Sequence, residues 1–371
     1  MNFDKSPILV FWETTKACRL ACRHCRAEAI AEPLPTQLSH EEGLAFIDRL
    51  LGFAPYRPVL IFTGGDPFMR SDLFELAAHA GQAGLPIGFA PSVTPLLDRE
   101  AASRMLEVGP KTVSISLDGA RPQTHEGIRG VDGHFERTLD AVRMLVDVGH
   151  TVQINTTVMR PNVEELADVA ALVASLAAHI WEVFFLIKVG RGQELEELTP
   201  EENEDVVQFL FDASHYGFIV RTVEAPFFRR VVAWRRDDGT CTAGFGGPLY
   251  ERLTTGLVDR LGPARLATKA QSVGTRDGKG ILFVSHDGYL YPSGFLPVPL
   301  GNVKRDDVVA VYRTHPLLRS IRRAEFTGRC GACEYADACG GSRARAFATS
   351  LNALGEDPAC AYSPAPLDLV L

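Results

Sequence analysis

Three cysteines near the N-terminus have a spacing that suits an inorganic cluster. Cys18, Cys22 and Cys25 form the pattern C-x3-C-x2-C within the segment CRLACRHC. Thiolates this close in sequence can reach one small metal core, and three of them on a four-iron cubane leave one iron without a protein ligand. An open iron binds and activates another molecule, whereas a fully ligated metal is structural or transfers electrons. Zinc with His24 as fourth ligand is the alternative, although this spacing differs from the usual zinc pairs.

Four further cysteines lie near the C-terminus. Cys330, Cys333, Cys339 and Cys360 read C-x2-C-x5-C, with the fourth cysteine after another twenty residues. Four thiolates saturate a [4Fe–4S] cluster, and they also saturate a structural zinc ion, so the ligand count does not separate the two. Cys241 is left over. We consider for it a buried thiol, a relic of a lost cluster, or a lid residue that reaches an active-site ion.

Composition restricts the setting in which such sites could work. The chain has 371 residues, of which 46% are hydrophobic and 23% charged, and a net charge of −8. These values indicate a globular protein with a sizeable core and argue against nucleic acid as a partner. No apolar stretch reaches the roughly 20 residues of a membrane helix, and the N-terminal MNFDKSPILVFWETT lacks a signal-peptide pattern. We therefore expect a cytoplasmic protein with no membrane partner, in which clustered cysteines are reduced and bind metal.

The elements that must position the first cysteines form a repeated strand–helix pattern up to about residue 215. The strand candidates are short, apolar and rich in β-branched or aromatic residues, as in strands buried on both faces. They are Leu9–Thr15, Val59–Phe62, Ile87–Ala90, Thr112–Leu117, Val152–Val158 and Val183–Ile187. Helical patterns separate them, and Ser39 with Glu42, like Asn162 with Glu165, has the spacing of a capping box. This order predicts a parallel α/β sheet, either an open barrel or doubly wound, with site residues at the strand carboxyl ends.

The remainder of the chain divides into two parts. Residues 237–280 are rich in glycine and weakly periodic, which indicates a long linker or lid. After them, Ile281–Val284 and Tyr289–Tyr291 flank Asp287-Gly288, a strong hairpin signal. The last part is rich in loops and cysteines. We therefore expect an α/β unit over 1–236, a flexible linker or lid over 237–280, and a small hairpin and cluster domain over 281–371.

The first cysteine set, placed directly after the first strand, resembles that of the radical S-adenosylmethionine (SAM) superfamily over about residues 8–215. The resemblance implies a partial (β/α)6 TIM-like barrel in which the three cysteines hold a [4Fe–4S] cluster and SAM chelates the open iron. In that family, reductive cleavage of SAM yields a 5′-deoxyadenosyl radical that abstracts hydrogen from a substrate, while the protein positions the reactants. An enzyme of oxidoreductase or lyase type is therefore expected.

Several downstream motifs resemble the SAM-binding segments of the same family. TGGDP at 63–67 matches a Gly-Gly-Glu-Pro segment that binds the methionine amine, with Asp66 in place of the commoner glutamate. SISLDG resembles S-x-D-G, and His125 with Arg129 resembles a stretch whose arginine pairs with the SAM carboxylate. Weaker candidates for ribose and adenine contacts, or equally for the core, lie on the fifth and sixth strands. The implied cofactor-binding residues are Thr63, Gly64, Gly65, Asp66, Ser116, Asp118, Arg129, Asn155 and Leu186.

The C-terminal cysteines resemble the SPASM and twitch extensions of radical SAM proteins. The full SPASM form shares a longer cysteine set between two auxiliary clusters, and this chain has Ser293 and Arg343 where further cysteines would stand. The resemblance implies one auxiliary [4Fe–4S] cluster on Cys330, Cys333, Cys339 and Cys360, which passes electrons and knits the tail onto the barrel. Arg343 and Arg345 form a basic run that either holds an acidic donor protein or substrate carboxylates, or is a solvated charge pair.

For the substrate, the segments CRHCRAEA and TGGDPFMRSDLFEL resemble the enzymes of alternative haem biosynthesis and an uncharacterised family near them. This resemblance implies a tetrapyrrole and a reaction such as removal of propionate carboxylates. A wide apolar pocket with basic groups would suit it, and aromatic and basic residues interleave around 184–191 and 227–230. The alternatives are a SPASM-type maturase of peptides or proteins, and a non-enzymatic electron carrier or zinc-stapled binding protein. A ferredoxin or flavodoxin is the expected electron donor.

Overall fold

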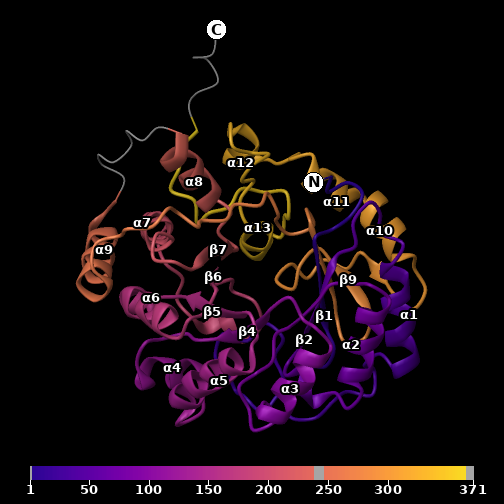
Figure 1. Cartoon of the computed structure of the whole chain (residues 1–371). Coiled ribbons are helices and arrows are strands. Elements are labelled where there is room, and N and C mark those ends of the chain that lie inside the picture. Colours follow the sequence, from indigo (N-terminus) through magenta and orange to yellow (C-terminus); the bar gives the residue numbers. More distant parts are fainter. Residues whose placement is uncertain (1, 238–245, 365–371) are drawn as a thin grey trace.

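The chain folds around one curved, largely parallel sheet (Figure 1). The computed structural model describes residues 2–237 and 246–364. Within them, the strands of a ten-stranded sheet follow the order β10-β9-β8-β1-β2-β3-β4-β5-β6-β7, so neighbours from β1 to β7 are also neighbours in sequence. The strands are β1 (Leu9–Glu13), β2 (Val59–Thr63), β3 (Ile87–Phe89), β4 (Val113–Ser116), β5 (Val152–Val158), β6 (Ile180–Phe185), β7 (Ile219–Val223), β8 (Ile281–Val284), β9 (Tyr289–Tyr291) and β10 (Gly301–Asn302).

Helices surround the outer face of this sheet, and Figure 1 shows α11, α12 and α13 of the tail on its upper side. The α-helices are α1 (His40–Leu50), α2 (Leu73–Gln82), α3 (Arg99–Glu107), α4 (Pro122–Arg129), α5 (His134–Val148), α6 (Leu166–Ser175), α7 (Pro200–Ala213), α8 (Phe228–Asp237), α9 (Pro248–Leu261), α10 (Val308–Thr314), α11 (Pro316–Arg322), α12 (Gly328–Ala332) and α13 (Arg343–Ser350). Short 3-10 turns form η1 (Pro67–Met69), η2 (Val163–Glu165) and η3 (Gly190–Glu194). In the described part of the chain, no helix is long and apolar enough to cross a lipid bilayer.

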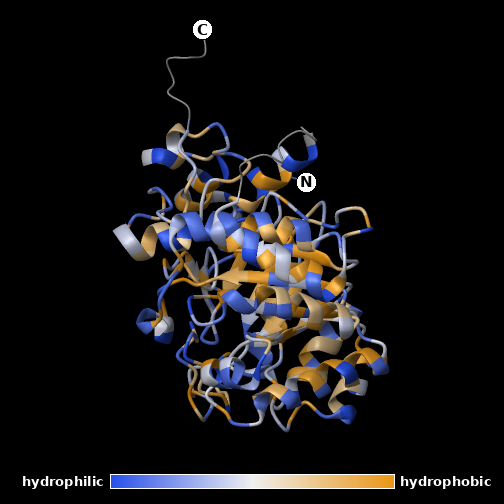
Figure 2. Cartoon of the chain, turned by 90° about the vertical axis from the view of Figure 1, so that its left-hand side faces the viewer, coloured by the Kyte–Doolittle hydropathy of each residue, from blue (hydrophilic) through white to orange (hydrophobic). Residues whose placement is uncertain are grey.

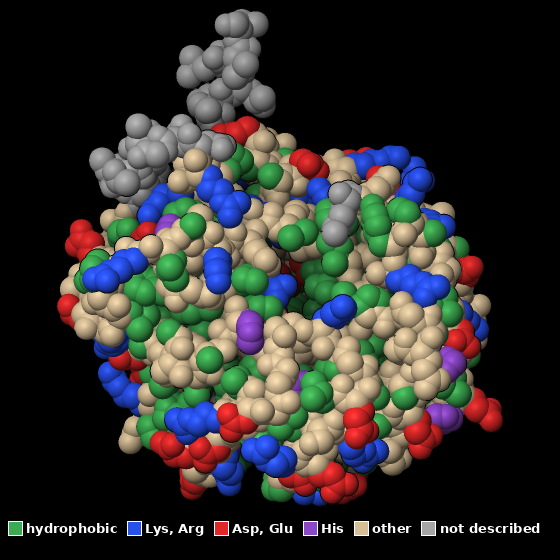
Figure 3. Space-filling view, in the orientation of Figure 1, with side chains coloured by type: hydrophobic (Ala, Val, Ile, Leu, Met, Phe, Trp, Pro, Cys, Tyr) green, Lys and Arg blue, Asp and Glu red, His purple; other side chains and the backbone are tan. Residues whose placement is uncertain are grey.

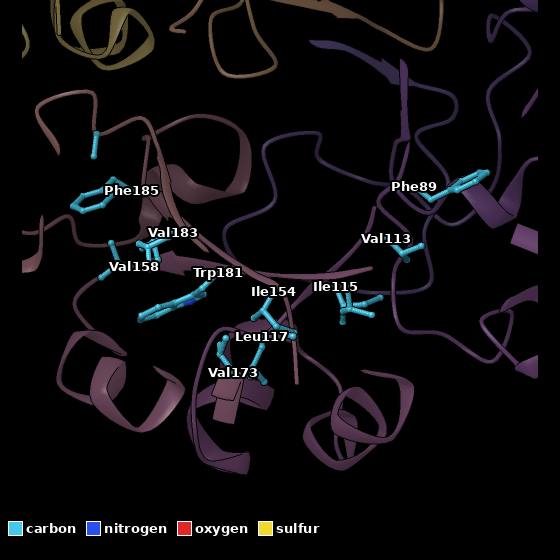
Figure 4. Packing of buried hydrophobic residues seen from close by; sticks show 14 of the residues in the cluster. Phe89, Val113, Ile115, Leu117, Ile154, Val158, Val173, Trp181, Val183 and Phe185 are labelled. Atoms are coloured by element: carbon cyan, nitrogen blue, oxygen red, sulfur yellow. The ribbon is translucent and has the colours of Figure 1, made fainter. Parts of the chain in front are cut away.

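Alternate residues along each strand divide between two environments. In β1, Val10 and Trp12 are fully buried on the helix side, whereas Leu9 and Phe11 face the space that the sheet encloses. Figure 4 shows the helix-facing side chains of β4, β5 and β6 with Val173 of α6 packed against them. Because helices cover one face and the enclosed space lies on the other, the strands read as nearly continuous apolar runs. Figure 2 shows the same division as hydrophobic strands inside and hydrophilic residues on the outer helices.

The predicted α/β partial barrel is confirmed, and the six predicted strands correspond to β1 through β6. The seventh parallel strand, β7, escaped prediction because Arg221 and Thr222 interrupt its short apolar run IVRTV. The predicted hairpin is also confirmed, since β8 pairs antiparallel with β9. In addition β8 pairs parallel with β1, so the tail contributes its first strand to the barrel sheet.

The segment 237–280 differs from the expected linker. Helix α9 occupies a large part of it, and Leu249, Leu253 and Leu257 are spaced four residues apart and buried. This face packs on α6 and α7. The prediction of a flexible linker or lid is therefore wrong for this part, because the glycine-rich composition masks a helical leucine repeat. Cys241 and its neighbours from 238 to 245 lie outside the described residues.

Of the two predicted capping boxes, the one at α1 is confirmed and the one at α6 is wrong. The side-chain amide of Asn162 donates to the carbonyl oxygens of Asp118 and Thr157, at 2.8 Å each. The carboxylate of Glu165 accepts a hydrogen bond from the backbone N–H of Ala120 at 2.8 Å. Both side chains therefore hold the loop after β4, where predicted site residues lie, instead of capping a helix.

Buried polar contacts at α13 fasten the tail to the barrel. Asp277 accepts hydrogen bonds from the first two backbone N–H groups of α13, at 3.0 Å each. Arg345 donates to the carbonyl oxygens of Leu186 and Glu224, at 3.1 and 3.0 Å. Arg343 and Arg345 are 0% and 4% exposed. Two of the predicted roles of this run, a surface for an acidic donor protein and a solvated charge pair, are therefore wrong, since these side chains are part of the interior. Contact with substrate carboxylates stays a prediction.

Candidate active site

A cavity of about 230 Å³ lies at the carboxyl ends of the barrel strands, and we call it the strand-end cavity. Its walls come from the cysteine loop after β1, the TGGDP segment after β2, strands β4 and β5, and the segment after β6. Figure 3 shows the molecule hollowed near the middle of the face turned to the viewer, with Lys and Arg side chains at the rim. The predicted site residues that line the strand-end cavity are Cys18, Cys22, Cys25, Thr63, Gly64, Gly65, Ser116, Arg129, Asn155 and Leu186.

The three cysteines of the first set lie together in the loop after β1. Cys18 and Cys22 belong to a small buried cluster against which Cys25 packs. The sulfur of Cys18 accepts a backbone N–H at 3.4 Å and lies 3.5 Å from the hydroxyl of Ser92, and that of Cys22 accepts from Nη1 of Arg129 at 3.5 Å. Burial raises the pKa of the Cys18 thiol, so a bound metal must displace its proton. Among the described residues, no three His, Cys, Asp or Glu side chains form a group that could hold a single metal ion.

The TGGDP segment is held against the cysteine loop through its glycines. The N–H of Gly65 donates to the carbonyl of Thr15 at 2.8 Å, and that of Asp66 donates to the carbonyl of Ala17 at 2.7 Å. A Cβ added to Gly64 would lie 2.5 Å from the oxygen of Thr15, and one added to Gly65 would lie 2.3 Å from that of Ala17. Such distances are shorter than nonbonded atoms tolerate, so glycine at both positions lets the two motifs run side by side.

Two of the predicted cofactor-binding residues, Asp66 and Asp118, are fully buried and do not line the strand-end cavity. Asp66 accepts hydrogen bonds from the hydroxyl of Thr94 at 2.9 Å and from two backbone N–H groups. Burial raises the pKa of this carboxyl. Asp66 therefore fixes η1 and the loop after β3, which corrects the prediction that its carboxylate faces a ligand.

Asp118 orients two residues of the strand-end cavity, Arg129 and His24. Its carboxylate lies 2.5 Å from Nη2 of Arg129 and 2.8 Å from Nε2 of His24, and it accepts the N–H of Thr157 at 2.7 Å. Burial alone would raise the pKa of Asp118, but Arg129 and His24 hold it well below its usual range, so the group stays ionised. Nε of Arg129 is buried without a hydrogen-bond partner in the described residues. An orphaned donor of this kind is costly, and a ligand carboxylate in the cavity would satisfy it.

A second cavity of about 410 Å³ fills the interior of the barrel, and we call it the inner chamber. The inward-facing residues of the strands line it, with cationic Lys111, Arg221 and Arg229 and anionic Glu182 and Glu224 among them. The residues that line both cavities are Arg26, Thr63, Ala90, Ser114, Asn155, Phe184 and Phe295. Because the two cavities share these walls, a molecule in the inner chamber can lie against one bound at the strand ends.

Arg26 lies at the junction of the strand-end cavity and the inner chamber. It directly follows Cys25, donates to Glu13 at 3.1 Å and lies 4.4 Å from the ring centroid of Phe283. The other oxygen of Glu13 lies 3.3 Å from Nδ1 of His286. Burial opposes ionisation of Glu13, yet Arg26 and His286 lower its pKa. Sequence reasoning missed this group because its members come from β1, the cysteine loop and the β8–β9 hairpin, which are far apart in sequence.

The basic and aromatic residues expected around a substrate divide in the structure. Phe184, Phe228 and Arg229 line the inner chamber, whereas Arg191 lines the strand-end cavity. Arg230, by contrast, is buried against Glu204. Some of the aromatic and basic residues at 184–191 and 227–230 therefore line a cavity, as predicted. The remaining ones belong to the core or the surface.

The four cysteines of the tail lie in α12 and in the loops on either side of α13. Backbone N–H groups of residues 357, 335 and 341 point at the sulfurs of Cys330, Cys333 and Cys339, at 3.4, 3.4 and 3.5 Å. Burial raises the pKa of Cys339 to about 12 and that of Cys360 to about 11. Thiols this weakly acidic become thiolates when a metal displaces their protons, and N–H groups aimed at sulfur suit metal-bound thiolates. The donor set fits a [4Fe–4S] cluster, and a zinc ion has the same ligand count.

Known proteins resemble this chain over most of its length. Residues 12–173 match the radical SAM superfamily. The AdoMet-dependent heme synthase of Nitratidesulfovibrio vulgaris is 35% identical over 368 residues, covering 97% of this chain and 94% of that protein. The mycofactocin maturase MftC of Mycobacterium ulcerans is 30% identical over 359 residues, covering 96% of this chain and 88% of that protein. The crystal structure of Streptococcus suis SuiB bound to precursor peptide SuiA matches with a TM-score of 0.68 at 12% identity, over 96% of this chain and 76% of that chain, which supports the fold alone.

Proposed function

The chain belongs to the radical SAM superfamily, and we propose that this radical SAM enzyme acts on an iron tetrapyrrole that carries propionate side chains. The reaction we infer is removal of propionate carboxylates in haem formation. The observation that carries this proposal is the inner chamber of about 410 Å³, which shares walls with the strand-end cavity and presents apolar and cationic groups together. The name of the heme synthase of 35% identity supports the same substrate class.

The chain's own residues fit the cofactors of the family. We propose that Cys18, Cys22 and Cys25 hold a [4Fe–4S] cluster, because their thiols lie together beside the strand-end cavity. When bound there, the cluster and SAM would supply the radical chemistry that removes a hydrogen atom from the substrate. Arg129 would offer its orphaned Nε to the SAM carboxylate, while Asp118 fixes its other edge. The remaining proposed SAM contacts are Thr63, Gly64, Gly65, Ser116, Asn155 and Leu186.

The inner chamber would orient the substrate and exclude water. Phe184 and Phe295 line both cavities, so they would contact the reacting edge of a macrocycle. Arg221 donates to Gln153 at 3.0 Å, and its buried Nε lies 3.7 Å from the carboxylate of Glu182 without a hydrogen-bond partner among the described residues. A guanidinium fork suits a carboxylate. We therefore assign Arg221 to a propionate that is held in place rather than removed.

Loss of one propionate carboxylate leaves one electron to be accepted. A hydrogen atom leaves the carbon attached to the macrocycle, the bond to the carboxyl carbon breaks, and carbon dioxide departs as a vinyl group forms. We propose that an auxiliary [4Fe–4S] cluster on Cys330, Cys333, Cys339 and Cys360 accepts the remaining electron, since the 341–342 segment forms part of the chamber wall. A cytoplasmic ferredoxin or flavodoxin would supply the electron that cleaves SAM, because free thiols persist in that compartment.

Binding of iron coproporphyrin III tests the substrate class first. The anaerobically reconstituted enzyme should shift the absorbance spectrum of this compound at roughly tens of micromolar. With SAM and dithionite it should then form 5′-deoxyadenosine, and a product lighter by the elements of formic acid for each propionate. Absence of a spectral shift would sink the tetrapyrrole proposal. Absence of 5′-deoxyadenosine would refute the assigned cysteine chemistry instead.

Peptide modification is the second candidate, and the mycofactocin maturase of 30% identity favours it. The two candidates differ in the molecule that occupies the inner chamber. The second candidate would replace the first on two results together. The enzyme would not bind iron coproporphyrin III, and it would change the mass of a supplied peptide while forming 5′-deoxyadenosine.

A further inference from the structure

Three arginines surround the tail cysteines without carboxylate partners. Arg276 is 4% and Arg343 is 0% exposed, and Arg229 is half-buried against the inner chamber. Among the described residues, none of these three guanidinium groups forms an ion pair with a carboxylate. Their neighbours behave differently, since Arg230 lies 2.5 Å from Glu204 and Arg345 lies 3.2 Å from Glu197. Asp277 and Asp337 act on Arg229 and Arg276 only from beyond ion-pair distance. Buried cations without a close counter-charge are costly, so this arrangement favours an anion at the site.

The same three arginines bind the backbone of the cysteine-bearing loops. Arg229 donates to the carbonyl of residue 338 at 3.1 Å, and Arg276 donates to those of residues 337 and 339 at 2.9 and 3.1 Å. Arg343 donates to the carbonyls of residues 341 and 353 at 3.3 and 3.2 Å, and its Nη2 lies 3.7 Å from the sulfur of Cys330. Burial lowers the pKa of Arg229 and of Arg276 to about 10, so both remain cations near neutral pH.

These contacts orient the peptide groups of the loops. Carbonyl oxygens point at the arginines, while backbone N–H groups of residues 335, 341 and 357 point at cysteine sulfurs. The sulfurs therefore face the positive ends of peptide dipoles, with guanidinium charges behind them. Four thiolates on a metal core carry the negative charge that this environment lacks.

We propose that Arg229, Arg276 and Arg343 raise the reduction potential of the [4Fe–4S] cluster held by the tail cysteines. Reduction adds one negative charge to a cluster, and nearby cations stabilise that charge strongly where the surroundings exclude water. Net charge and hydrogen bonds to sulfur are among the factors that set the potential of such clusters. The inference rests on a tail cluster of iron and sulfur, and it does not depend on the tetrapyrrole substrate.

The location of these arginines connects the raised reduction potential of the cluster with the inner chamber. Arg229 and Arg276 line the inner chamber, together with Gly341 and Ser342 from the loop that follows Cys339. In the proposed decarboxylation, the electron left after carbon dioxide departs would reduce this cluster from its 2+ to its 1+ state. A cluster with a higher potential is a better acceptor for that electron. Arg343 also stands where a fuller cysteine set would continue, so a buried cation replaces a ligand of a second auxiliary cluster.

The chain offers a matched control in Arg329. It precedes Cys330 directly in sequence and donates to the carbonyl of Cys360 at 3.3 Å, so it too contacts the backbone of a tail cysteine. However, its side chain is 43% exposed and lies 3.4 Å from the carboxylate of Glu356. Water and this carboxylate screen its charge, so its removal should leave the potential of the cluster unchanged.

The test is a redox titration of the full-length chain in which Cys18, Cys22 and Cys25 are alanine, so that only the tail site can hold a cluster. Arg229→Gln and Arg276→Gln remove charge and keep an amide donor, and each should lower the midpoint potential at unchanged iron content. Arg276→Lys and Arg329→Gln should keep the parent value. The proposal is overturned if both glutamine variants keep that value, or if Arg329→Gln lowers it as much as they do.

Wild-type protein gives a second measurement if both glutamine variants lose their iron. In an electron paramagnetic resonance titration, the tail cluster should be reduced at a higher potential than the N-terminal cluster. The opposite order would overturn the proposal. A tail site that holds zinc would overturn it as well, and binding of iron coproporphyrin III, measured separately, would show whether the proposed substrate survives that result.

Discussion

The two cysteine sites use the same ligand type but balance charge in opposite ways. At the N-terminal site two arginines beside the cysteines are paired with carboxylates, Arg129 at 2.5 Å from Asp118 and Arg26 at 3.1 Å from Glu13. Arg191 on the cavity wall has no ion pair among the described residues and donates to the carbonyl of Ala29. At the tail site, Arg276 and other guanidinium groups contact backbone carbonyls instead. The difference matches the two proposed tasks. SAM brings a sulfonium cation, which a site with unbalanced arginines would repel, whereas a fully ligated cluster is an anion that such arginines stabilise.

Access separates the two sites as well. Cys18, Cys22 and Cys25 line the strand-end cavity, which shares walls with the inner chamber. None of the four tail cysteines lines either cavity in the described part of the chain, whereas the 341–342 segment does line the inner chamber. A cluster at the first site could therefore receive a ligand, whereas a cluster at the second could exchange only electrons with the chamber.

The largest effect should come from removing the ligands of one site at a time. Changing Cys18, Cys22 and Cys25 together to alanine should abolish 5′-deoxyadenosine formation, because no open iron remains to bind SAM, and about four irons per chain should stay in the tail. Changing Cys330 and Cys333 to alanine should remove about four irons per chain and lower the stability of the tail. Iron analysis and product detection measure both results. Iron content that stays at the parent level in the second variant would argue against any tail cluster.

Arg343→Gln should have the next largest effect, on stability. Its guanidinium contacts carbonyls from both sides of α13, and their loss leaves buried acceptors unsatisfied at a cost of roughly 3 kcal/mol. Hydrogen exchange of the 328–360 segment should therefore quicken strongly. The exposed Arg329→Gln is the matched control and should cost about 0–1 kcal/mol. Equal effects of the two substitutions would remove the contrast between buried and screened cations.

Local sequence patterns predict much of this fold. The cysteine spacings, six short apolar strands and the Asp287-Gly288 hairpin all depend on residues close in sequence, and the structure contains these strands and this hairpin. The sequence motifs identify Asp118, Arg343 and Arg345 but do not predict which groups surround them. Their partners come from distant segments, such as Glu197 and Asp357 for Arg345. Sequence spacing cannot show which charges the fold will bury together.

Asp118→Asn should make the N-terminal site resemble the tail. Arg129 and His24 would both lose the negatively charged carboxylate beside them. The net positive charge of the site would therefore rise. We expect the Kd for SAM to increase about 10- to 100-fold, as for other groups that orient a metal site from behind. Equilibrium binding to the reconstituted enzyme measures it. Asp140→Asn, which breaks an exposed pair with Arg143, is the control and should leave the Kd unchanged; so should Asp118→Asn if Asp118 has no such role.

The smallest effect should be a difference in how the two sites respond to acid. Burial lowers the pKa of His125 from 6.5 to about 3 and that of His134 to about 4. Their contribution to stability is therefore present above pH 6.5 and is lost as the pH falls toward these values, by about 1.4 kcal/mol per pH unit for each histidine. Burial, with repulsion from Asp277, raises the pKa of Glu224 well above 4.5. Its contribution is present at low pH and is lost as the pH rises through that raised value.

Acidification should consequently loosen α4 and α5 while it tightens the contact between Glu224 and α13. Hydrogen exchange of the metal-free protein between about pH 7.5 and 5.5, corrected for intrinsic rates, can follow both segments at once. His125→Asn keeps an acceptor for the N–H of Asp118 and should weaken the first response alone. Glu224→Gln keeps a partner for Ser342 and should remove the second alone. If both segments respond to acid in the same direction, the two sites are not balanced in opposite ways, because buried histidines and a buried carboxyl of raised pKa must shift stability with opposite sign.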